Sequence, residues 1–96
     1  MTRESQIEKY LHDRVKALGG EYRRMSWIGR RNANDDLILL YDPPRHLVVE
    51  CKRPGEDATE AQAREHDRLR RAGCEIHVVS TFEQIDAILP PPKAKP

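Results

Sequence analysis

Apolar residues recur at helical spacing near the beginning of the chain. The residues that follow one another at intervals of three and four are Ile7, Tyr10, Leu11, Val15 and Leu18. This spacing places them on one face of a helix. Ser5 can cap the helix, and Gly19-Gly20 supplies a left-handed end. The pattern therefore predicts a first helix that begins near Ser5 and ends at the glycine pair.

Three segments after this helix have the pattern of strands. Residues 21–28 alternate between two faces, residues 37–41 form a continuous apolar run, and residues 46–52 are rich in β-branched side chains. Residues 29–35 are polar and rich in Asn and Gly, which predicts a loop before the second strand. The prolines within residues 42–45 predict a turn. A connection this short favours an antiparallel hairpin between the second and third strands.

The remaining residues predict a helix, a strand and a final helix. Residues 59–72 form a helix with a sparse apolar face that ends at Gly73. Residues 74–80 form a fourth strand, which we expect to be parallel to the third because a helix joins them. Thr81 caps a last short helix, and Pro90-Pro91-Pro92 ends it. The order α-β-β-β-α-β-α predicts a small α/β sandwich with a mixed central sheet, in one domain over residues 1–89 with a disordered Pro/Lys tail over 90–96.

Length and composition narrow the possible classes of protein. A chain of 96 residues, 38% of them hydrophobic, builds one domain with a thin core, which a partner subunit would help to cover. No apolar run approaches the ~18 residues of a membrane span, and the charged N-terminus is not a signal peptide, so we expect a cytoplasmic protein. The two cysteines and four histidines lack ligand spacing, which argues against a disulfide scaffold or a zinc module. A net charge of +1, taken alone, argues against a nucleic-acid-binding domain.

Two charged residues end the third predicted strand, which is otherwise apolar. Because side chains alternate along a strand, Glu50 and Lys52 share one face and Cys51 points to the other. Burying such charges costs several kcal/mol unless they are paired or hold a metal ion. One interpretation is a salt bridge at the end of the strand. The other is a functional site.

The second predicted strand favours the functional site. Folding the hairpin about Pro43-Pro44 brings residue 36 level with about residues 50 to 52. Asp36 and Glu50 would then converge as oxygen ligands for Mg²⁺ or Mn²⁺, with Lys52 beside them. Asp35 is the competing ligand. Strand alternation favours Asp36, with Asp35 turned away, and a register shift of one residue would exchange them.

Asp36, thirteen intervening residues and then Glu50-Cys51-Lys52 resemble the signature of the PD-(D/E)XK nuclease superfamily. A longer pattern is similar to the VRR-NUC family, the virus-type replication-repair nucleases. It is carried by residues 29–40, 48–55, 59–62 and 69–76, and the resemblance extends from Ser5 to about Leu89. It implies a restriction-endonuclease-like fold and a divalent-metal-dependent DNA endonuclease, of a kind found in compact phage and bacterial proteins and in larger repair enzymes.

The resemblance also implies roles for individual residues. It makes Asp36 and Glu50 metal ligands, Lys52 the catalytic lysine, Gln62 the active-site glutamine, and Glu8 the acidic residue of the first helix. The Cys51 backbone carbonyl is a further candidate ligand. The chain departs from the family pattern at Asp35, where a proline is usual, and at His66, where related nucleases often have a tyrosine.

Three of these positions also have structural interpretations. Ser5-x-x-Glu8 and Thr59-x-x-Gln62 are capping-box sequences, in which the Glu or Gln bonds its own helix start. His66 fits a solvated helix position, which we favour over a catalytic base.

The predicted reaction is hydrolysis of a phosphodiester bond. A cation on the carboxylates would lower the pKa of bound water, and Lys52 would position or deprotonate that water or stabilise the transition state. Five arginines are candidates for binding nucleic acid: Arg23, Arg24, Arg30, Arg31 and Arg53. Trp27 either stacks on a base or packs in the core.

The resemblance further implies a homodimer that acts on branched DNA such as Holliday junctions. The competing hypotheses are a non-catalytic nucleic-acid-binding module with the nuclease fold, and an interaction protein whose charges lie only on the surface. Under the nuclease hypothesis, the placement of charge beside the site matters more than the net charge.

Overall fold

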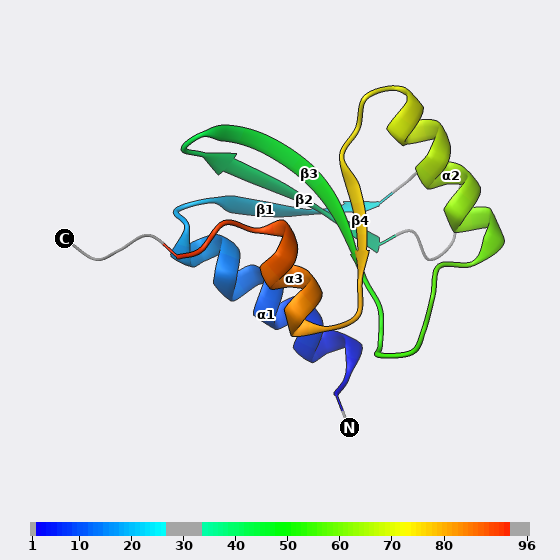
Figure 1. Ribbon diagram of the computed structural model, residues 1–96, viewed down its shortest axis with the longest axis horizontal. Coiled ribbons are helices and arrows are strands. Elements are labelled where there is room, and N and C mark those ends of the chain that lie inside the picture. Colours follow the sequence, from blue (N-terminus) through cyan, green and yellow to red (C-terminus); the bar gives the residue numbers. More distant parts are fainter. Residues whose placement is uncertain (1, 27–33, 93–96) are drawn as a thin grey trace.

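Seven elements follow one another in the computed structural model, which describes residues 2–26 and 34–92 (Figure 1). Their order is helix, three strands, helix, strand, helix, as the sequence predicts. Their bounds are α1 Glu4–Ala17, β1 Glu21–Ser26, β2 Asn34–Tyr41, β3 Pro44–Cys51, α2 Glu60–Arg71, β4 Ile76–Val79 and α3 Phe82–Ile88. The predictions for Trp27, Arg30, Arg31 and residues 93–96 of the tail lie outside the described residues.

The four strands form one sheet in the order β1-β2-β3-β4. The pairs β1–β2 and β2–β3 are antiparallel, and β3–β4 is parallel. The two-residue turn between β2 and β3 forces the antiparallel pairing, whereas the crossover through α2 lets β4 run parallel to β3. The predicted mixed sheet and α/β class are confirmed.

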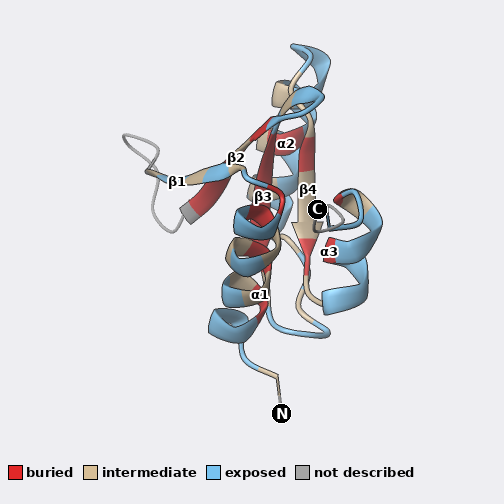
Figure 2. Ribbon diagram, turned by 90° about the vertical axis from the view of Figure 1, so that its left-hand side faces the viewer, coloured by how far each residue is buried: buried red, intermediate tan, exposed pale blue. Residues whose placement is uncertain are grey.

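The hydrophobic core lies between the sheet and the helices α1 and α3. Figure 1 shows these two helices side by side, with α2 apart from them beside β4. Buried residues are concentrated in β2, β3, β4 and the inner side of α1 (Figure 2). Alternate residues of the strands, among them Ile38, Leu47 and Val49, meet Leu11 and Ile85 in this core. No described helix has the length and apolarity of a membrane span.

The N-caps of α2 and α3 are the residues that the sequence predicts, whereas the N-cap of α1 is a different residue. At α2, Thr59 Oγ1 accepts from the Gln62 N–H at 3.2 Å, and Gln62 Oε1 accepts from the Thr59 N–H at 2.9 Å, so the predicted capping box is present. Thr81 caps α3 as predicted. The predicted Ser5 cap of α1 is wrong, because the N-cap is Arg3, two residues earlier, and Gln6 Oε1 accepts from the Arg3 N–H at 2.6 Å. Glu8 is therefore not part of a capping box.

The predicted loop over residues 29–35 is too long at its C-terminal end. β2 begins at Asn34, so Asp35 and Asp36 are strand residues. Asp36 lies opposite Arg24 of β1, and Asp35 lies opposite Met25. Pairing with β1 draws these two aspartates into the sheet against their low intrinsic strand propensity.

Candidate active site

The sheet opens between β2 and β3 near the beginning of β2. The β2–β3 pairing ends at Asp36 opposite Val49. Beyond that point β2 stays paired with β1 back to Asn34, and β3 stays paired with β4 as far as Cys51. We call this opening the fork.

The backbone of β3 directs a carbonyl toward the fork. The Val48 N–H donates to the carbonyl of Glu75, just before β4, and the Lys52 N–H donates to that of Val79, the last residue of β4. Each distance is 2.8 Å. Because backbone groups alternate in direction along a strand, those of Cys51 point the other way, toward β2. The Cys51 carbonyl, a candidate ligand from the sequence, is therefore directed toward the fork.

The register places the two aspartates on opposite faces of the sheet. Residues directly opposite each other in a ladder share a face, so Asp36 lies on the α1 face with Val49. Asp35 and Glu50, the next residue of each strand, lie on the other face. The predicted convergence of Asp36 with Glu50 is therefore wrong: residue 36 is level with 49, and Asp35 is the aspartate beside Glu50.

A buried group of polar side chains occupies the fork on the α2 face. Asp35 and Glu50 come from the sheet and His66 from α2; each residue is 4% exposed, and their ligand atoms lie within 4.8 Å of one another. Lys52 Nζ lies 3.4 Å from Glu50 Oε1, and His66 Nε2 lies 3.3 Å from Glu50 Oε2. We call Asp35, Glu50, Lys52 and His66 the fork cluster. Glu50 and Lys52 share a face as predicted, but the prediction of a solvated His66 is wrong.

The fork cluster concentrates negative charge in a buried place. Burial raises the pKa of Glu50; Asp35 raises it further, and Lys52 and His66 act in the opposite direction. Glu50 Oε2 has no hydrogen-bond partner among the described residues. A divalent cation bound by these carboxylates would offset the charge and occupy the unpaired oxygen. The donor set therefore fits a metal ion.

A second group lies on the α1 face of the same strand. Glu8 and His12, one helical turn apart on α1, meet Asp36 with their ligand atoms within 4.8 Å of one another. His12 Nε2 lies 3.0 Å from Asp36 Oδ2, and the His12 ring stacks on Tyr22 at 3.7 Å between ring centroids. Glu8 forms an ion pair with Arg24. We call Glu8, His12 and Asp36 the α1 cluster.

Asp36 in the α1 cluster resembles Glu50 in the fork in its burial and in having one oxygen without a hydrogen bond. It is 2% exposed, and its Oδ1 has no hydrogen-bond partner within the described part of the chain. Burial raises the pKa of Asp36, while the hydrogen bond and charge of His12 lower it. The α1 cluster thus also offers oxygen ligands, from buried Asp36 and half-buried Glu8, on the opposite face of β2 from the fork.

The other predicted site residues lie near these clusters but have partners of their own. The Gln62 side chain is used in the capping box of α2, as its structural interpretation predicts. Arg23 pairs with Glu21 at 3.0 Å, and Arg53 pairs with Glu56 at 2.9 Å. Both arginine side chains are exposed enough to exchange these partners for phosphate.

The sequence analysis did not single out His12, and it turned Asp35 away from Glu50 and placed His66 in solvent, whereas these three side chains lie in the two carboxylate clusters. A usable signal was present: Glu8 and His12 are four residues apart, and so are Gln62 and His66. Side chains at this spacing lie on one face of a helix. A histidine that follows a candidate site residue by one turn is thus a candidate as well.

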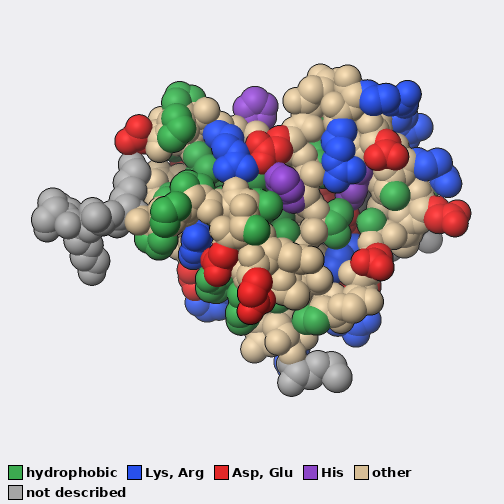
Figure 3. Space-filling model, viewed as in Figure 1, with side chains coloured by type: hydrophobic (Ala, Val, Ile, Leu, Met, Phe, Trp, Pro, Cys, Tyr) green, Lys and Arg blue, Asp and Glu red, His purple; other side chains and the backbone are tan. Residues whose placement is uncertain are grey.

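Basic residues also gather over α2, interleaved with acidic ones (Figure 3). Arg68 pairs with Glu65 and Arg70 with Asp67, and Arg64 approaches Glu60 at 4.0 Å. These short-range pairs are those of a solvated helix face, and they leave little net charge at the surface.

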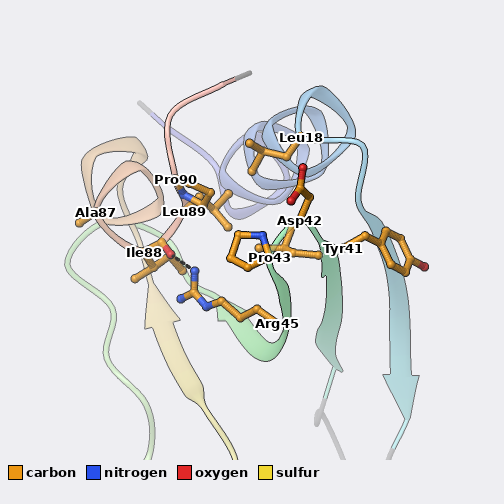
Figure 4. Close-up of a pocket in the computed structure, with 10 residues that line it drawn as sticks. Leu18, Tyr41, Asp42, Pro43, Arg45, Ala87, Ile88, Leu89 and Pro90 are labelled. Atoms are coloured by element: carbon orange, nitrogen blue, oxygen red, sulfur yellow. Dashed lines mark hydrogen bonds between the residues drawn. The ribbon is translucent and has the colours of Figure 1, made fainter. Parts of the chain in front are cut away.

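A pocket of about 350 Å³ lies at the opposite end of the β2–β3 hairpin. Figure 4 shows Tyr41, Pro43 and Leu18 around it, with Arg45 donating from Nη1 to the Ile88 carbonyl at 2.8 Å. The turn is about five residues from the end of the β2–β3 ladder, or roughly 17 Å of extended strand. The pocket is therefore separate from both carboxylate clusters.

Comparison with known proteins agrees with this arrangement. No protein-family model matches the sequence. The chain is 38% identical over 90 residues to "Putative nuclease p44" of Acyrthosiphon pisum secondary endosymbiont phage 1, covering 94% of this chain and 95% of that protein. A solved structure described as "VRR_NUC domain" is similar with a TM-score of 0.74 and 36% identity, covering 92% of this chain and 95% of that one.

The fold and these relatives define the class as a small α/β nuclease domain. Within that class, the chain belongs to the VRR-NUC family. The family resemblance predicted from the sequence is confirmed.

Proposed function

We propose that this protein is a divalent-metal-dependent DNA endonuclease whose catalytic centre is the fork cluster. The observation that carries the proposal is Glu50: a buried carboxylate with an unpaired oxygen, beside Asp35, His66 and Lys52, in a nuclease fold. Asp35, Glu50 and the Cys51 carbonyl would hold Mg²⁺ or Mn²⁺. When bound, the cation would lower the pKa of a bound water and offset charge on the scissile phosphate.

Lys52 provides the second charge that phosphodiester hydrolysis needs. Its ammonium group lies 3.4 Å from Glu50 Oε1, and its side chain is 15% exposed, so it is both held in place and accessible to a substrate phosphate. We assign it to stabilising the negative charge that develops on the phosphate oxygens. Gln62 precedes His66 by one turn, and we assign it a supporting role on the substrate once it releases the Thr59 N–H.

Glu8 and Asp36 keep their predicted role as metal ligands, but on the other face of β2. Together with His12 they would hold a second divalent cation in the α1 cluster. The unpaired Asp36 Oδ1 supports this assignment in the same way as Glu50 Oε2 supports the first. We assign the reaction to the fork because Lys52 lies there.

The proposed substrate is DNA, contacted at its phosphates by arginines near the site. Arg24 lies on the α1 face beside Glu8, whereas the adjacent Arg23 of β1 points to the opposite face. Arg53 follows Lys52 directly. The predicted contributions of Arg30 and Arg31 lie outside the described residues. Replacing Arg23 and Arg53 by alanine should lower the salt dependence of duplex binding, by about 0.9 in slope for each phosphate that the protein no longer neutralises.

We further propose a homodimer that cuts branched DNA, such as Holliday junctions, during phage or bacterial DNA replication and repair in the cytoplasm of the cell. The phage origin of the named relative supports the setting, and the thin core supports association. Sedimentation at micromolar concentration tests the dimer. A monomer would contradict paired cleavage of a four-way junction by this protein alone.

The proposed activity is tested on linear, nicked, flapped and four-way DNA with Mg²⁺ or Mn²⁺. Glu50→Gln and Asp35→Asn should each lower cleavage about 1,000-fold, the equivalent of about 4 kcal/mol of transition-state stabilisation. Glu60→Gln, at an acid whose side chain is 97% exposed, is the matched control and should cut like the wild type. DNA binding without cleavage in either metal would instead indicate a non-catalytic binding module.

Asp35 and Asp36 allow a test of the strand register. The same Asp→Asn change at adjacent buried positions alters opposite faces of β2. If the fork is the catalytic centre, Asp35→Asn should be the more damaging change. Loss of activity in Asp36→Asn with near-normal cleavage by Asp35→Asn would move the catalytic centre to the α1 face.

A further inference from the structure

His66 is the one buried residue of α2, a helix that the structure describes over its whole length. The helix has no buried apolar side chain, so it meets the sheet through an imidazole placed against a carboxylate. The His66 side chain is 5% exposed, as is that of Glu50. An imidazole that lies in a carboxylate cluster, where a packing residue would be expected, points to a ligand.

The two oxygens of Glu50 face different groups. Oε1 faces Lys52 Nζ at 3.4 Å, and Oε2 faces His66 Nε2 at 3.3 Å. The second approach does not give Oε2 a hydrogen-bond partner among the described residues, and the residue is 4% exposed. Glu50 Oε2 thus lies at ion-pair distance from the imidazole nitrogen of His66 without a hydrogen bond to it.

The separation of these atoms suits two ligands of one ion. Adjacent ligands of an octahedral ion with bonds of about 2.1 Å lie about 3 Å apart. The 3.3 Å between Nε2 and Oε2 agrees with this value, and an oxygen of Asp35 lies within 4.8 Å of both. Little rearrangement is needed for the three side chains to surround one cation.

We propose that His66 is a nitrogen ligand of the fork cation and that it makes the site prefer Mn²⁺ over Mg²⁺. This inference rests on the fork being the metal centre of the proposed nuclease. Mg²⁺ favours an all-oxygen shell, whereas Mn²⁺ and the later divalent transition metals also accept imidazole. Asp35 and Glu50 alone would serve either ion, so the preference comes from His66.

The test measures the metal environment directly. Electron spin-echo envelope modulation of Mn²⁺-loaded His12→Gln, in which the α1 cluster has lost its imidazole, should show ¹⁴N coupling, and the coupling should disappear in the His12→Gln/His66→Gln double variant. The His12→Gln background is necessary because the second cation proposed for the α1 cluster would itself couple to the nitrogen of His12. His46→Gln, at an exposed position of β3, is the matched control.

Binding measurements by calorimetry supply the second readout. His66→Gln should weaken Mn²⁺ binding about tenfold or more, while Mg²⁺ binding changes far less. Absence of ¹⁴N coupling in the wild type overturns the inference even if His66→Gln fails to fold. Coupling that is absent in His12→Gln, or that persists in the double variant, also overturns it.

DNA cleavage by the wild type in each metal is scored separately from the ¹⁴N coupling. Coupling that depends on His66, in a protein that cuts no DNA, supports the ligand role of His66 and contradicts the nuclease proposal. DNA cleavage by a protein without ¹⁴N coupling supports the nuclease proposal and contradicts the ligand role of His66.

Discussion

The ion pair between Arg45 and Glu75 connects three elements on the side of β3 that faces β4. Arg45 of β3 donates from Nε to Glu75 Oε1 at 3.0 Å and from Nη2 to Oε2, and from Nη1 to the carbonyl of Ile88 in α3. His77 of β4 lies 2.7 Å from the same carboxylate. We predict that Glu75→Gln lowers the free energy of unfolding measurably at pH 7, since it removes the charge that this two-point contact requires.

The pKa of Glu75 sets the size of the effect. The hydrogen bond from Arg45, with a further one from His77, lowers this pKa from 4.5 to about 2 against the opposing effect of burial. The difference between these two pKa values corresponds to an upper limit of about 3 kcal/mol. The side chains of Glu75 and Arg45 are 35% and 32% exposed. Solvent screening therefore reduces the expected loss of unfolding free energy to about 1–2 kcal/mol.

The pH dependence follows from the direction of the shift. A carboxyl group whose folded pKa is depressed stabilises the protein fully above its unfolded pKa, and this contribution disappears as the pH falls through the folded value. The difference between wild type and Glu75→Gln should therefore be complete above about pH 5 and shrink between pH 4.5 and about 2. Urea unfolding of both proteins at pH 7, 4 and 2.5 measures it. A difference that is unchanged at pH 2.5, or absent at pH 7, would refute the reasoning.

Three further outcomes follow from the packing and from the fork. Gly20→Ala should destabilise the fold by about 1–3 kcal/mol in chemical unfolding, because its Cβ would lie 2.6 Å from a backbone carbonyl of β2; Gly55→Ala, with open space around it, should cost only the ~1 kcal/mol of its positive φ. In the native protein a thiol reagent should modify Cys74 and spare the buried Cys51, and both should react after unfolding. Mn²⁺ at about 100 times the Kd of a site should raise the free energy of unfolding by about 2.7 kcal/mol for each site that it fills, and a gain in Glu50→Gln equal to that of the wild type at the same Mn²⁺ concentration would contradict the fork site.

The fold could be predicted because its signals are local. Apolar runs of strand length, the spacing on α1, the short turn after β2 and the helical crossover to β4 predict the order of the elements and the relative directions of β2, β3 and β4. Capping at Thr59 and Thr81 also depends on a few neighbouring residues. The beginning of β2 could not be found this way, because pairing with β1 decides whether Asp35 and Asp36 belong to a strand.

The candidate site likewise has features that the local sequence predicts and features that depend on how distant elements pack. Glu50 and Lys52 share a face because alternation along one strand is a local property, and the sequence predicts it. Whether Asp35 or Asp36 meets Glu50 depends on the register between two strands, and a small shift exchanges all the side chains on the two faces. With 36 opposite 49, Asp36 shares a face with Val49, and Glu50 shares the other face with Asp35. His66 depends on how α2 meets the sheet, which its sparse apolar pattern does not specify.

The two aspartates show why a strand suits a centre of this kind. Consecutive residues of β2 point to opposite faces, so Asp35 and Asp36 give one buried carboxylate to each helix-covered side, at 4% and 2% exposure. Each then meets a histidine from a different helix, His66 of α2 or His12 of α1. According to the family resemblance, a proline is usual at position 35. Family members with that proline would lack the carboxylate that Asp35 supplies here. If the fork holds a metal ion in this protein, its ligand set is therefore particular to chains with an acid at that position, and Asp35→Pro should remove the fork site while leaving the α1 cluster its three ligands.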